Sequence, residues 1–384
     1  MSADPVEFLR GIAAELADIH RGKHYAQWRG EASHRVDAFL STVEPFAAYA
    51  NSWVFTGDGG GCVVQGRFGD WAIDRLVEKV PPEEIICRAE EELRRNSAVY
   101  SELSPVFGVE IDAECVLAPD IGILPQPPEP FGALDQPWLF SMGLPTGTSS
   151  LVQSFTVAPA FERRDDRSTS PKCVGATRPV MEERQAVRRR VRLACLLASP
   201  GAVELPIWQL QPDRKALMAA GAGNQAGRPF DAHPLVSMPV EQEVVKRNYD
   251  FLDRFSEPAS LERAIDRLGR SRLAVAAVDR AIELGMAAEI ALMHDHSPSN
   301  TEITFKIASR AAWLLGDDAD GRAAVFDQMK QLYRARSTAV HSGTMPSRQA
   351  VDLDAADRLV SRALSGILGR GRFPDWQKLT MGAR

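Results

Sequence analysis

An arginine and a histidine lie five positions apart near the C-terminal end of the chain, in Gln331-Leu-Tyr-Arg-Ala-Arg336-Ser-Thr-Ala-Val-His341-Ser-Gly343. Arginine keeps its positive charge and can bind two phosphate oxygens through its planar guanidinium group. Histidine is the side chain whose proton moves most easily near neutral pH. Together the two residue types suit metal-free cleavage of an RNA phosphodiester, in which a 2′-hydroxyl attacks the adjacent phosphate.

The same spacing occurs three times, at Arg29 and His34, at Arg228 and His233, and at Arg336 and His341. The first arginine is followed directly by a glycine. The second is followed by a proline, which breaks a helix. The third lies in a run without proline or glycine that ends at Gly343, as expected for the C-terminal end of a long amphipathic helix. We therefore expect chemistry only at the third copy.

Bulk properties indicate a chain of two domains, because 384 residues exceed one ordinary core. The five cysteines form no CxxC pair, which argues against a cysteine zinc site or a disulfide framework. A net charge of -6 argues against a protein that coats nucleic acid by overall charge. No apolar run has the length of a bilayer-spanning helix, and the N-terminus lacks the pattern of a signal peptide. We expect a cytoplasmic protein with no membrane association and no cofactor.

Hydrophobic periodicity predicts an α+β fold. In residues 1–235 it predicts an irregular α+β region, with helices over 6–20, 71–80, 83–95 and 182–197, a charged linker at 162–172, and short strands between turns rich in glycine and proline. The Gly-, Ala- and Pro-rich segment 219–239 is the expected boundary. Residues 240–384 are predicted to be all helical, over 242–254, 261–268, 271–293, 302–315, 322–340 and 353–368. Short polar connections favour an antiparallel bundle.

The C-terminal third resembles the HEPN superfamily, most closely its Apea-like branch. Three segments carry the resemblance in the family's order: 287–292 with Glu289, 302–316 with Arg310, and 332–341 with Arg336 and His341. The resemblance implies a HEPN-like bundle of four or five helices that forms a homodimer, with the two motifs facing each other across a two-fold axis. Many members are metal-independent endoribonucleases of toxin–antitoxin, abortive-infection and antiphage systems, and several cleave tRNA. The N-terminal region would then recognise a phage or cellular trigger.

Within that resemblance His341 is the general acid or base, and Arg336 holds the phosphate. Glu289 is expected to orient one of them. Ser337 supplies the polar residue after the arginine, where many active members carry Asn or Asp. Five residues at ~100° leave Arg336 and His341 about 140° apart on an ideal helix. They can share a substrate only if the helix ends or distorts near His341, or if each works with the other subunit.

Further side chains are candidate substrate contacts: Tyr333, Arg334, Arg310, Arg188, Arg189 and Arg190. Each has a structural alternative. Tyr333 is typical of a core position, and Glu289 is as typical of a partner for Arg310. The arginine-rich stretch 184–192 is as typical of a solvated helix paired with Glu182 and Glu183. Arg336 and His341 themselves suit a helix C-terminus, where positive charge is favourable.

Other patterns are assigned structural meanings. His294-Asp295-His296 and the pair His20 and His24 include metal-ligand residue types, but we interpret them as a turn and an exposed helical pair. Gly57-Asp-Gly-Gly-Gly61 lacks the lysine of a phosphate-binding loop, so a hairpin turn is expected.

Two alternative functions remain. In one, the bundle is a catalytically inactive dimerisation or docking module, with Arg336 buried in a salt bridge and His341 facing no groove. In the other, the active site is a polar pocket lined by residues 50–210.

Overall fold

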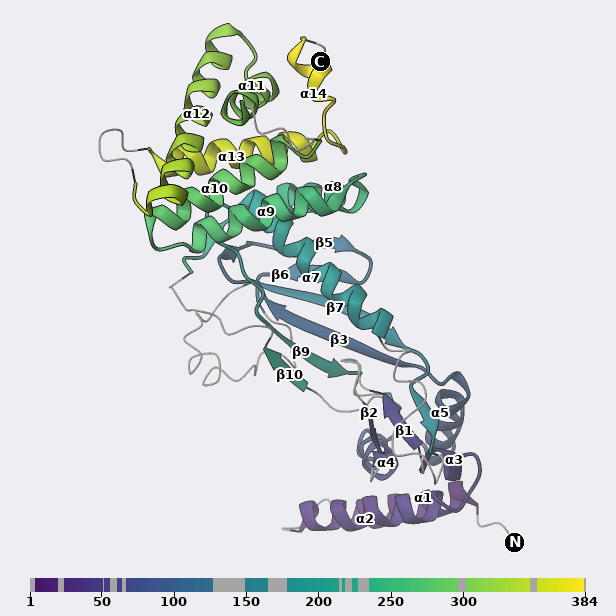
Figure 1. Cartoon of the computed structure of the whole chain (residues 1–384). Coiled ribbons are helices and arrows are strands. Elements are labelled where there is room, and N and C mark those ends of the chain that lie inside the picture. Colours follow the sequence, from purple (N-terminus) through teal and green to yellow (C-terminus); the bar gives the residue numbers. More distant parts are fainter. Residues whose placement is uncertain are drawn as a thin grey trace. The chain divides into compact units, whose positions relative to one another are not determined.

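The computed structural model describes residues 4–19, 24–50, 52–55, 61–63, 67–126, 149–164, 178–213, 216–217, 223–226, 235–295, 302–345 and 351–382 (Figure 1). The fold is α+β, as predicted. The chain divides into two compact units that each draw on several segments. The first holds Met1–Leu103, Val152–Ala186 and Trp208–Ala226, and the second holds Ser104–Leu151, Val187–Ile207 and Gly227–Arg384.

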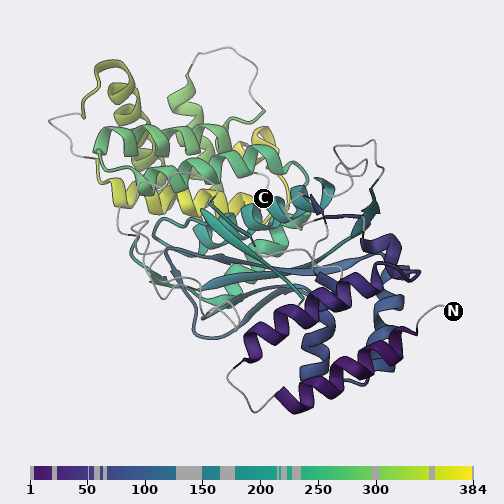
Figure 2. The same ribbon diagram turned by 90° about the horizontal axis from the view of Figure 1, so that it is seen from below.

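The first unit is built around its helices. These are α1 (Pro5–Ile19), α2 (Tyr25–Leu40), α3 (Phe46–Ala50), α4 (Arg67–Val77) and α5 (Pro82–Arg95). Figure 2 shows α1 and α2 in dark purple, and α2 packs against both α1 and α4. Apolar side chains at helical spacing, including Leu9, Ile12 and Val36, are fully buried in the core of this unit.

Two sets of strands complete the first unit. A three-stranded sheet has the order β2 (Gly61–Val63), β1 (Ser52–Phe55), β8 (Phe161–Arg163), with antiparallel pairing throughout. In a second sheet, four strands lie in the order β10 (Gly223–Ala226), β9 (Ile207–Pro212), β3 (Ala98–Pro105), β7 (Ser150–Val157). These strands alternate with helices along the chain, which agrees with the predicted irregular α+β region.

The second unit contains the helical bundle. Its helices are the later part of α7 (Arg178–Ala198), α8 (Gln242–Arg254), α9 (Pro258–Leu273), α10 (Ala277–Leu292), α11 (Ile303–Leu315), α12 (Ala319–Ser342), α13 (Leu353–Leu368) and α14 (Trp376–Thr380). Strands β5 (Cys115–Ala118) and β6 (Ile121–Leu124) form an antiparallel hairpin, and β4 (Val109–Glu110) pairs with β11 (Met238–Pro239) in parallel. Among the helices of the described residues, none is long and apolar enough to cross a membrane.

Helix α10 lies at the centre of the bundle, where it packs against α9, α11, α12 and α13. Its buried positions are mostly small residues, such as Ala281, Gly285 and Ala288, so neighbouring helices can approach closely. Helix α12 is defined by both of its caps. The Asp318 carboxylate accepts a hydrogen bond from the backbone N–H of Gly321 at 2.7 Å, and Gly343 ends the helix at a φ of 67°.

The predicted helices of the bundle are present, with one correction. Residues 271–293 were expected to form one helix, but α9 ends at Leu273 and α10 begins at Ala277. Ala274 and Ala276 are extended, and Val275 is 75% exposed instead of lying on the predicted apolar face. The reversal lets α9 and α10 pack against each other, so burial of two helix faces outweighs the local periodicity.

Two further findings differ from the sequence analysis. The units are not divided once near residue 235, because the second unit also takes segments 104–151 and 187–207. In addition, the stretch that contains Arg29 and His34 is helix α2. Helical context therefore does not by itself separate Arg336 and His341 from this copy of the motif. Arg29 instead pairs with Asp74 at 2.7 Å, which gives it a structural role.

Candidate active site around Arg336

The side chain of Arg336 lies against α10, where a glycine leaves room for it. A Cβ atom added to Gly285 would lie 2.6 Å from the Cβ of Arg336 and nearer still to its Cγ. Such contacts are closer than folded proteins allow. Glu289 follows Gly285 by four residues and therefore lies on the same face of α10, one turn further along. The arginine stem thus crosses the glycine, and its guanidinium group reaches the carboxylate.

Glu289 receives two groups from α12. The Nη2 atom of Arg336 lies 3.3 Å from its Oε2, and the hydroxyl of Tyr333 donates a hydrogen bond to the same oxygen at 3.1 Å. The guanidinium carbon of Arg336 also lies 5.4 Å from the centre of the Tyr333 ring. Burial of the tyrosine and the adjacent Glu289 carboxylate raise the pKa of Tyr333 to about 12. The phenol is therefore protonated at neutral pH and acts as a fixed donor.

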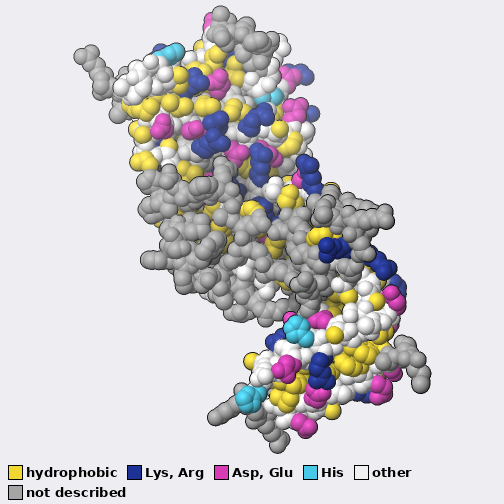
Figure 3. Space-filling view, turned by 60° about the horizontal axis from the view of Figure 1, so that its bottom comes forward, with side chains coloured by type: hydrophobic (Ala, Val, Ile, Leu, Met, Phe, Trp, Pro, Cys, Tyr) yellow, Lys and Arg dark blue, Asp and Glu magenta, His cyan; other side chains and the backbone are white. Residues whose placement is uncertain are grey.

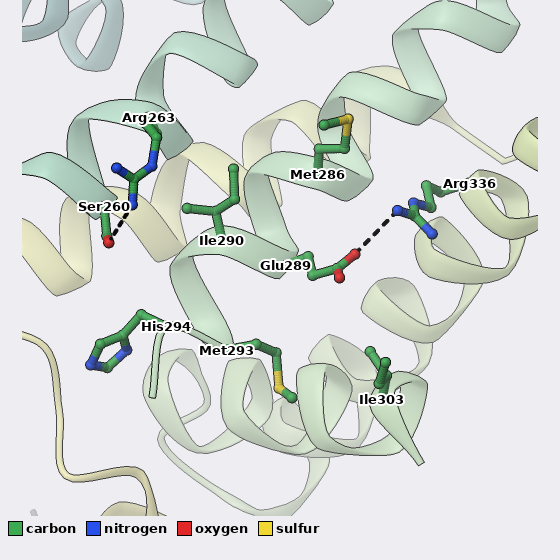
Figure 4. A pocket seen from close by; sticks show the side chains of 9 residues that line it. All are labelled: Ser260, Arg263, Met286, Glu289, Ile290, Met293, His294, Ile303 and Arg336. Atoms are coloured by element: carbon green, nitrogen blue, oxygen red, sulfur yellow. Dashed lines mark hydrogen bonds and ion pairs between the residues drawn. The ribbon is translucent and has the colours of Figure 1, made fainter. Parts of the chain in front are cut away.

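A pocket of about 410 Å³ opens beside this ion pair. Figure 4 shows Arg336 and Glu289 at one end and His294, Ser260 and Arg263 at the other. The walls between them are apolar and come from Met286, Ile290, Met293 and Ile303. Charged and polar groups at the ends of an apolar cavity are typical of sites for small ligands or parts of larger ones. We call this cavity the Arg336 pocket.

The donors of Arg336 are much less satisfied than those of a structural arginine in the same bundle. Arg272 donates to the Asp357 carboxylate, to the Ser361 hydroxyl and to three backbone carbonyls, and its side chain is only 4% exposed. Arg336 has one ion-pair contact at 3.3 Å, and its side chain is 25% exposed. Its Nε is buried and has no acceptor among the described residues. The buried Nε is out of reach of a ligand, but Arg336 lines the pocket with one ion pair for its whole guanidinium group, so the group has donor capacity left for an anion.

His341 lies in the last turn of α12 and is exposed. The helix is regular up to Ser342, and the Gly343 N–H still donates to the Ala339 carbonyl at 3.0 Å. The helix therefore neither ends nor distorts between Arg336 and His341. The two side chains diverge by ~140° and lie ~7.5 Å apart along the axis. Within one chain Arg336 faces α10, whereas His341 faces away from the pocket.

The structure places the remaining motif residues as follows. Ser337 is partly exposed next to Arg336, and Arg334 is exposed. Tyr333 is only 7% exposed, which favours its core alternative, and its contact with substrate stays a prediction. Arg310 bonds to the Asp295 carboxylate and the Leu292 carbonyl at 2.7 and 2.6 Å. It therefore closes the end of α10, and its contact with substrate stays a prediction.

The arginines predicted to contact substrate from α7 are buried or form ion pairs within the protein. Arg188 is 7% exposed. Arg189 lies 3.2 Å from both Glu262 and Asp266, and Arg190 lies 2.8 Å from Asp253. The acidic partners come from α8 and α9, not from the neighbouring Glu182 and Glu183. Arg189 and Arg190 are therefore paired within the fold, which favours the structural alternative, and their contact with RNA stays a prediction. Figure 3 likewise shows basic and acidic side chains intermixed over the C-terminal helices.

The candidate metal ligands have other roles or lie outside the described residues. The His294 ring stacks on Phe373 at 3.8 Å, and its Nδ1 accepts a hydrogen bond from the Trp376 indole at 3.2 Å. Burial and Arg310 lower the pKa of His294 more than Asp295 and Glu257 raise it. Within the described ranges no three His, Cys, Asp or Glu residues are grouped to hold a metal ion. His20, His296 and residues 57–60 are not described.

Gly285 and Arg263 belong to the site although neither was among the candidate residues predicted from the sequence. Gly285 precedes Glu289 by one helical turn, so this glycine–glutamate spacing on a helix was a signal that could have located it. Arg263 comes from α9, and only the packing of α9 on α10 brings it to the pocket.

Compared with known proteins, the chain matches no family model, no curated protein and no solved structure.

Proposed function

We propose that the protein is a metal-independent endoribonuclease that acts as a homodimer joined through its C-terminal bundle. The observation that carries this proposal is that Arg336 is fixed in position while some of its hydrogen-bond donors remain unused. It is held in place by Gly285 and Glu289, yet it keeps donors that no described residue uses. A preorganised cation with spare donors beside a pocket is what stabilisation of a phosphate transition state requires. The order of the three motif segments supports the same reading, as does an exposed histidine on the same helix.

In the proposed reaction the 2′-hydroxyl of the substrate attacks the adjacent phosphorus. The new 2′-O–P bond forms as the P–O5′ bond breaks, which gives a 2′,3′-cyclic phosphate and a 5′-hydroxyl. One imidazole takes the proton of the 2′-hydroxyl, and a second gives a proton to the leaving oxygen. Arg336 binds the non-bridging oxygens, and Glu289 fixes its orientation. DNA lacks the attacking hydroxyl and is not cut.

A regular α12 bears directly on the oligomeric state. Arg336 and His341 of one chain point in directions ~140° apart, so they do not meet on one phosphate. Each chain also carries a single histidine in the motif. A two-fold dimer supplies the second imidazole and brings the histidine of one subunit near the arginine of the other. The biological role proposed here is that of a toxin or antiphage effector, with tRNA among the candidate substrates and the N-terminal region responding to the trigger.

The test uses His341→Ala and a matched control from the same chain, His34→Ala, which removes the histidine of the other helical Arg-x4-His copy. Both proteins and the wild type are incubated with total RNA in EDTA, and 2′,3′-cyclic phosphate ends are counted. General acid–base catalysis is worth ~10²–10⁴-fold, so His341→Ala should lose at least ~100-fold. His34→Ala should cleave like the wild type. Cleavage by His341→Ala at the wild-type rate, or an active protein that sediments as a monomer, contradicts the proposal.

A second candidate function is a dimerisation or docking module without turnover. Two observations favour it: Arg336 already has an ion pair with Glu289, and His341 is not among the residues that line the Arg336 pocket. In that case the ion pair serves only the packing of α12 on α10. Arg336→Ala would then lower the stability of the bundle, and purified wild-type dimer would produce no cyclic phosphate ends from any RNA.

A further inference from the structure

A second pocket lies where the start of α11 meets α12, and it differs in character from the Arg336 pocket. Its volume is about 450 Å³. The lining residues are Glu302, Thr304, Phe305, Phe326, Lys330 and Arg334. Two aromatic rings and two cations thus converge on one cavity, and the function proposed above uses none of these residues. We call it the Phe305 pocket.

Phe305 is unusual for a phenylalanine because 58% of its surface is exposed. Its ring packs edge-on against Phe326, with centroids 5.6 Å apart and planes at 68°. One edge of Phe305 is therefore fixed by a neighbouring ring, while much of its surface remains open. The Nζ of Lys330 lies 5.5 Å from the centre of the Phe326 ring. An aromatic ring that is held in place and still exposed is suited to stacking on a flat apolar ligand.

The two cations of the pocket are uncommitted. Neither Lys330 nor Arg334 forms an ion pair with any residue that the structure describes, whereas Arg189 and Arg190 on α7 each have acidic partners. Glu302 is the one acid among the lining residues. The pocket therefore carries net positive charge, which complements a phosphate-bearing ligand.

Helix geometry connects this pocket to His341. At ~100° per residue, Phe326, Lys330, Arg334 and His341 fall within a sector of ~80° on α12. Arg334 and His341 are separated by ~10 Å along the helix axis, about three nucleotides at the stacked rise of 3.4 Å. The pocket and the histidine therefore share one exposed face of α12, while Arg336 is directed towards α10.

We propose that the Phe305 pocket is a base-stacking subsite for single-stranded RNA. A base stacks on Phe305, the phosphates on either side bind Lys330 and Arg334, and the strand continues along α12 to His341. The combination of a stacking ring with cations that follow the backbone is how sequence-tolerant single-strand sites are built. A second copy of the chain fits this pocket less well, because a two-fold contact would bring the same cations together. The proposal rests on the proposed function for the choice of RNA as the strand.

The test separates binding from cleavage by using a probe that cannot be cut. A fluorescein-labelled 12-nucleotide strand with 2′-O-methyl groups is titrated with the full-length protein, and its anisotropy gives the dissociation constant. Loss of a stacked base should weaken binding about fivefold or more in Phe305→Ala. Phe305→Trp keeps a stacking surface and should bind at least as tightly as the wild type. Thermal melting of each variant verifies that the bundle remains folded.

The charge contacts have their own readout. Lys330→Ala and Arg334→Ala should each lower the slope of log affinity against log salt by ~0.7, the value for one phosphate contact on a single strand. Arg362→Ala on α13 removes one exposed positive charge elsewhere in the bundle and should leave the slope unchanged. Glu302→Gln removes the repulsive carboxylate and should tighten binding severalfold.

The possible outcomes separate this inference from the proposed function. Wild-type affinity in Phe305→Ala and Lys330→Ala overturns the subsite, and so does a wild-type protein that does not bind the strand. If Phe305→Ala changes the sedimentation of the protein but not its RNA affinity, the pocket is a protein contact and the subsite is again refuted. Binding through Phe305 without any cleavage of unmodified RNA would sustain the subsite and refute the nuclease.

Discussion

Replacement of Gly285 by alanine tests whether Arg336 lies against α10. The new Cβ would stand 2.6 Å from the Cβ of Arg336, an atom that cannot move away without α12. Overpacking of this kind costs ~1–3 kcal/mol. Alanine also gains up to ~1 kcal/mol over glycine inside a helix. With the full gain of ~1 kcal/mol subtracted from the cost of overpacking, the net expectation is a destabilisation of about 0–2 kcal/mol.

A matched control variant separates the cost of overpacking from the gain in helix propensity. Gly366 lies inside α13 of the same unit, and a Cβ there would meet Leu314 and Leu315 at an ordinary contact distance of 3.8 Å. Gly366→Ala should therefore be stabilising by ~0.5–1 kcal/mol. Because both variants gain the same propensity, the difference between them isolates the overpacking of ~1–3 kcal/mol.

Differential scanning calorimetry measures both variants in the same transition, since both glycines belong to the second unit. One kcal/mol corresponds to ~2–4 °C for a domain of roughly 150–250 residues. Gly285→Ala should melt at least ~2 °C below Gly366→Ala. Under the proposed function it should also lose RNA cleavage, because the guanidinium group is displaced, whereas Gly366→Ala should retain it. Equal melting temperatures would show that Arg336 does not occupy the space over Gly285, and the site described here would be refuted.

Three further predictions concern the polar contacts of the second unit. The pKa of Tyr333 is raised to about 12. The stability that the protonated phenol contributes is therefore complete below the ordinary tyrosine pKa near 10 and is lost as the pH rises from there through about 12. The unfolding free energy of the wild type should fall across that pH range, and that of Tyr333→Phe should lack this fall. The pKa of His294 is lowered. The stability that its neutral ring contributes is therefore present above the ordinary histidine pKa near 6.5 and is lost as the pH falls from there through the lower folded-state pKa. Over that pH range the melting temperature of His294→Phe should fall less than that of the wild type. Asp357→Ala leaves the buried Arg272 without its carboxylate partner. The unfolding free energy in urea should fall by ~3–5 kcal/mol, the largest of these effects. A loss below ~1 kcal/mol would contradict the buried ion pair.

The local sequence was sufficient for much of the bundle. Helix α12 has an aspartate cap, a glycine stop and apolar residues at helical spacing, so its existence and its end at Gly343 could be predicted. Helices α8 and α13 were predicted at the bounds that the structure gives them. The break between α9 and α10 could not be predicted, because residues 274–276 carry no proline or glycine to mark it. Helix α2 was missed since it lacks the strong apolar periodicity of the other helices.

Part of the candidate site could also be predicted from the sequence, and part could not. Arg336 and His341 were identified from residue types and spacing, and Glu289 from the family resemblance. The structure brings Arg336 and Glu289 into contact, and the orienting role of Glu289 stays a prediction. The roles of Tyr333, Arg310 and the α7 arginines were not predictable, because each depends on an acid, a carbonyl or a core position supplied by another element. A charge pattern along one helix does not reveal which charges are neutralised across an interface.

By itself, then, the sequence determined which residues can hold a phosphate or move a proton, and which segments are helical. The tertiary structure alone decided that Gly285 gives Arg336 its place on α10 and that His341 and Arg334 share the opposite, exposed face of α12. It also decided that Arg189, Arg190 and Arg310 have acidic partners within the fold. The physical reason is that side-chain direction follows from local helix geometry, whereas the availability of a charged group depends on its neighbours in space. Those neighbours are set by packing between segments that lie far apart in the chain.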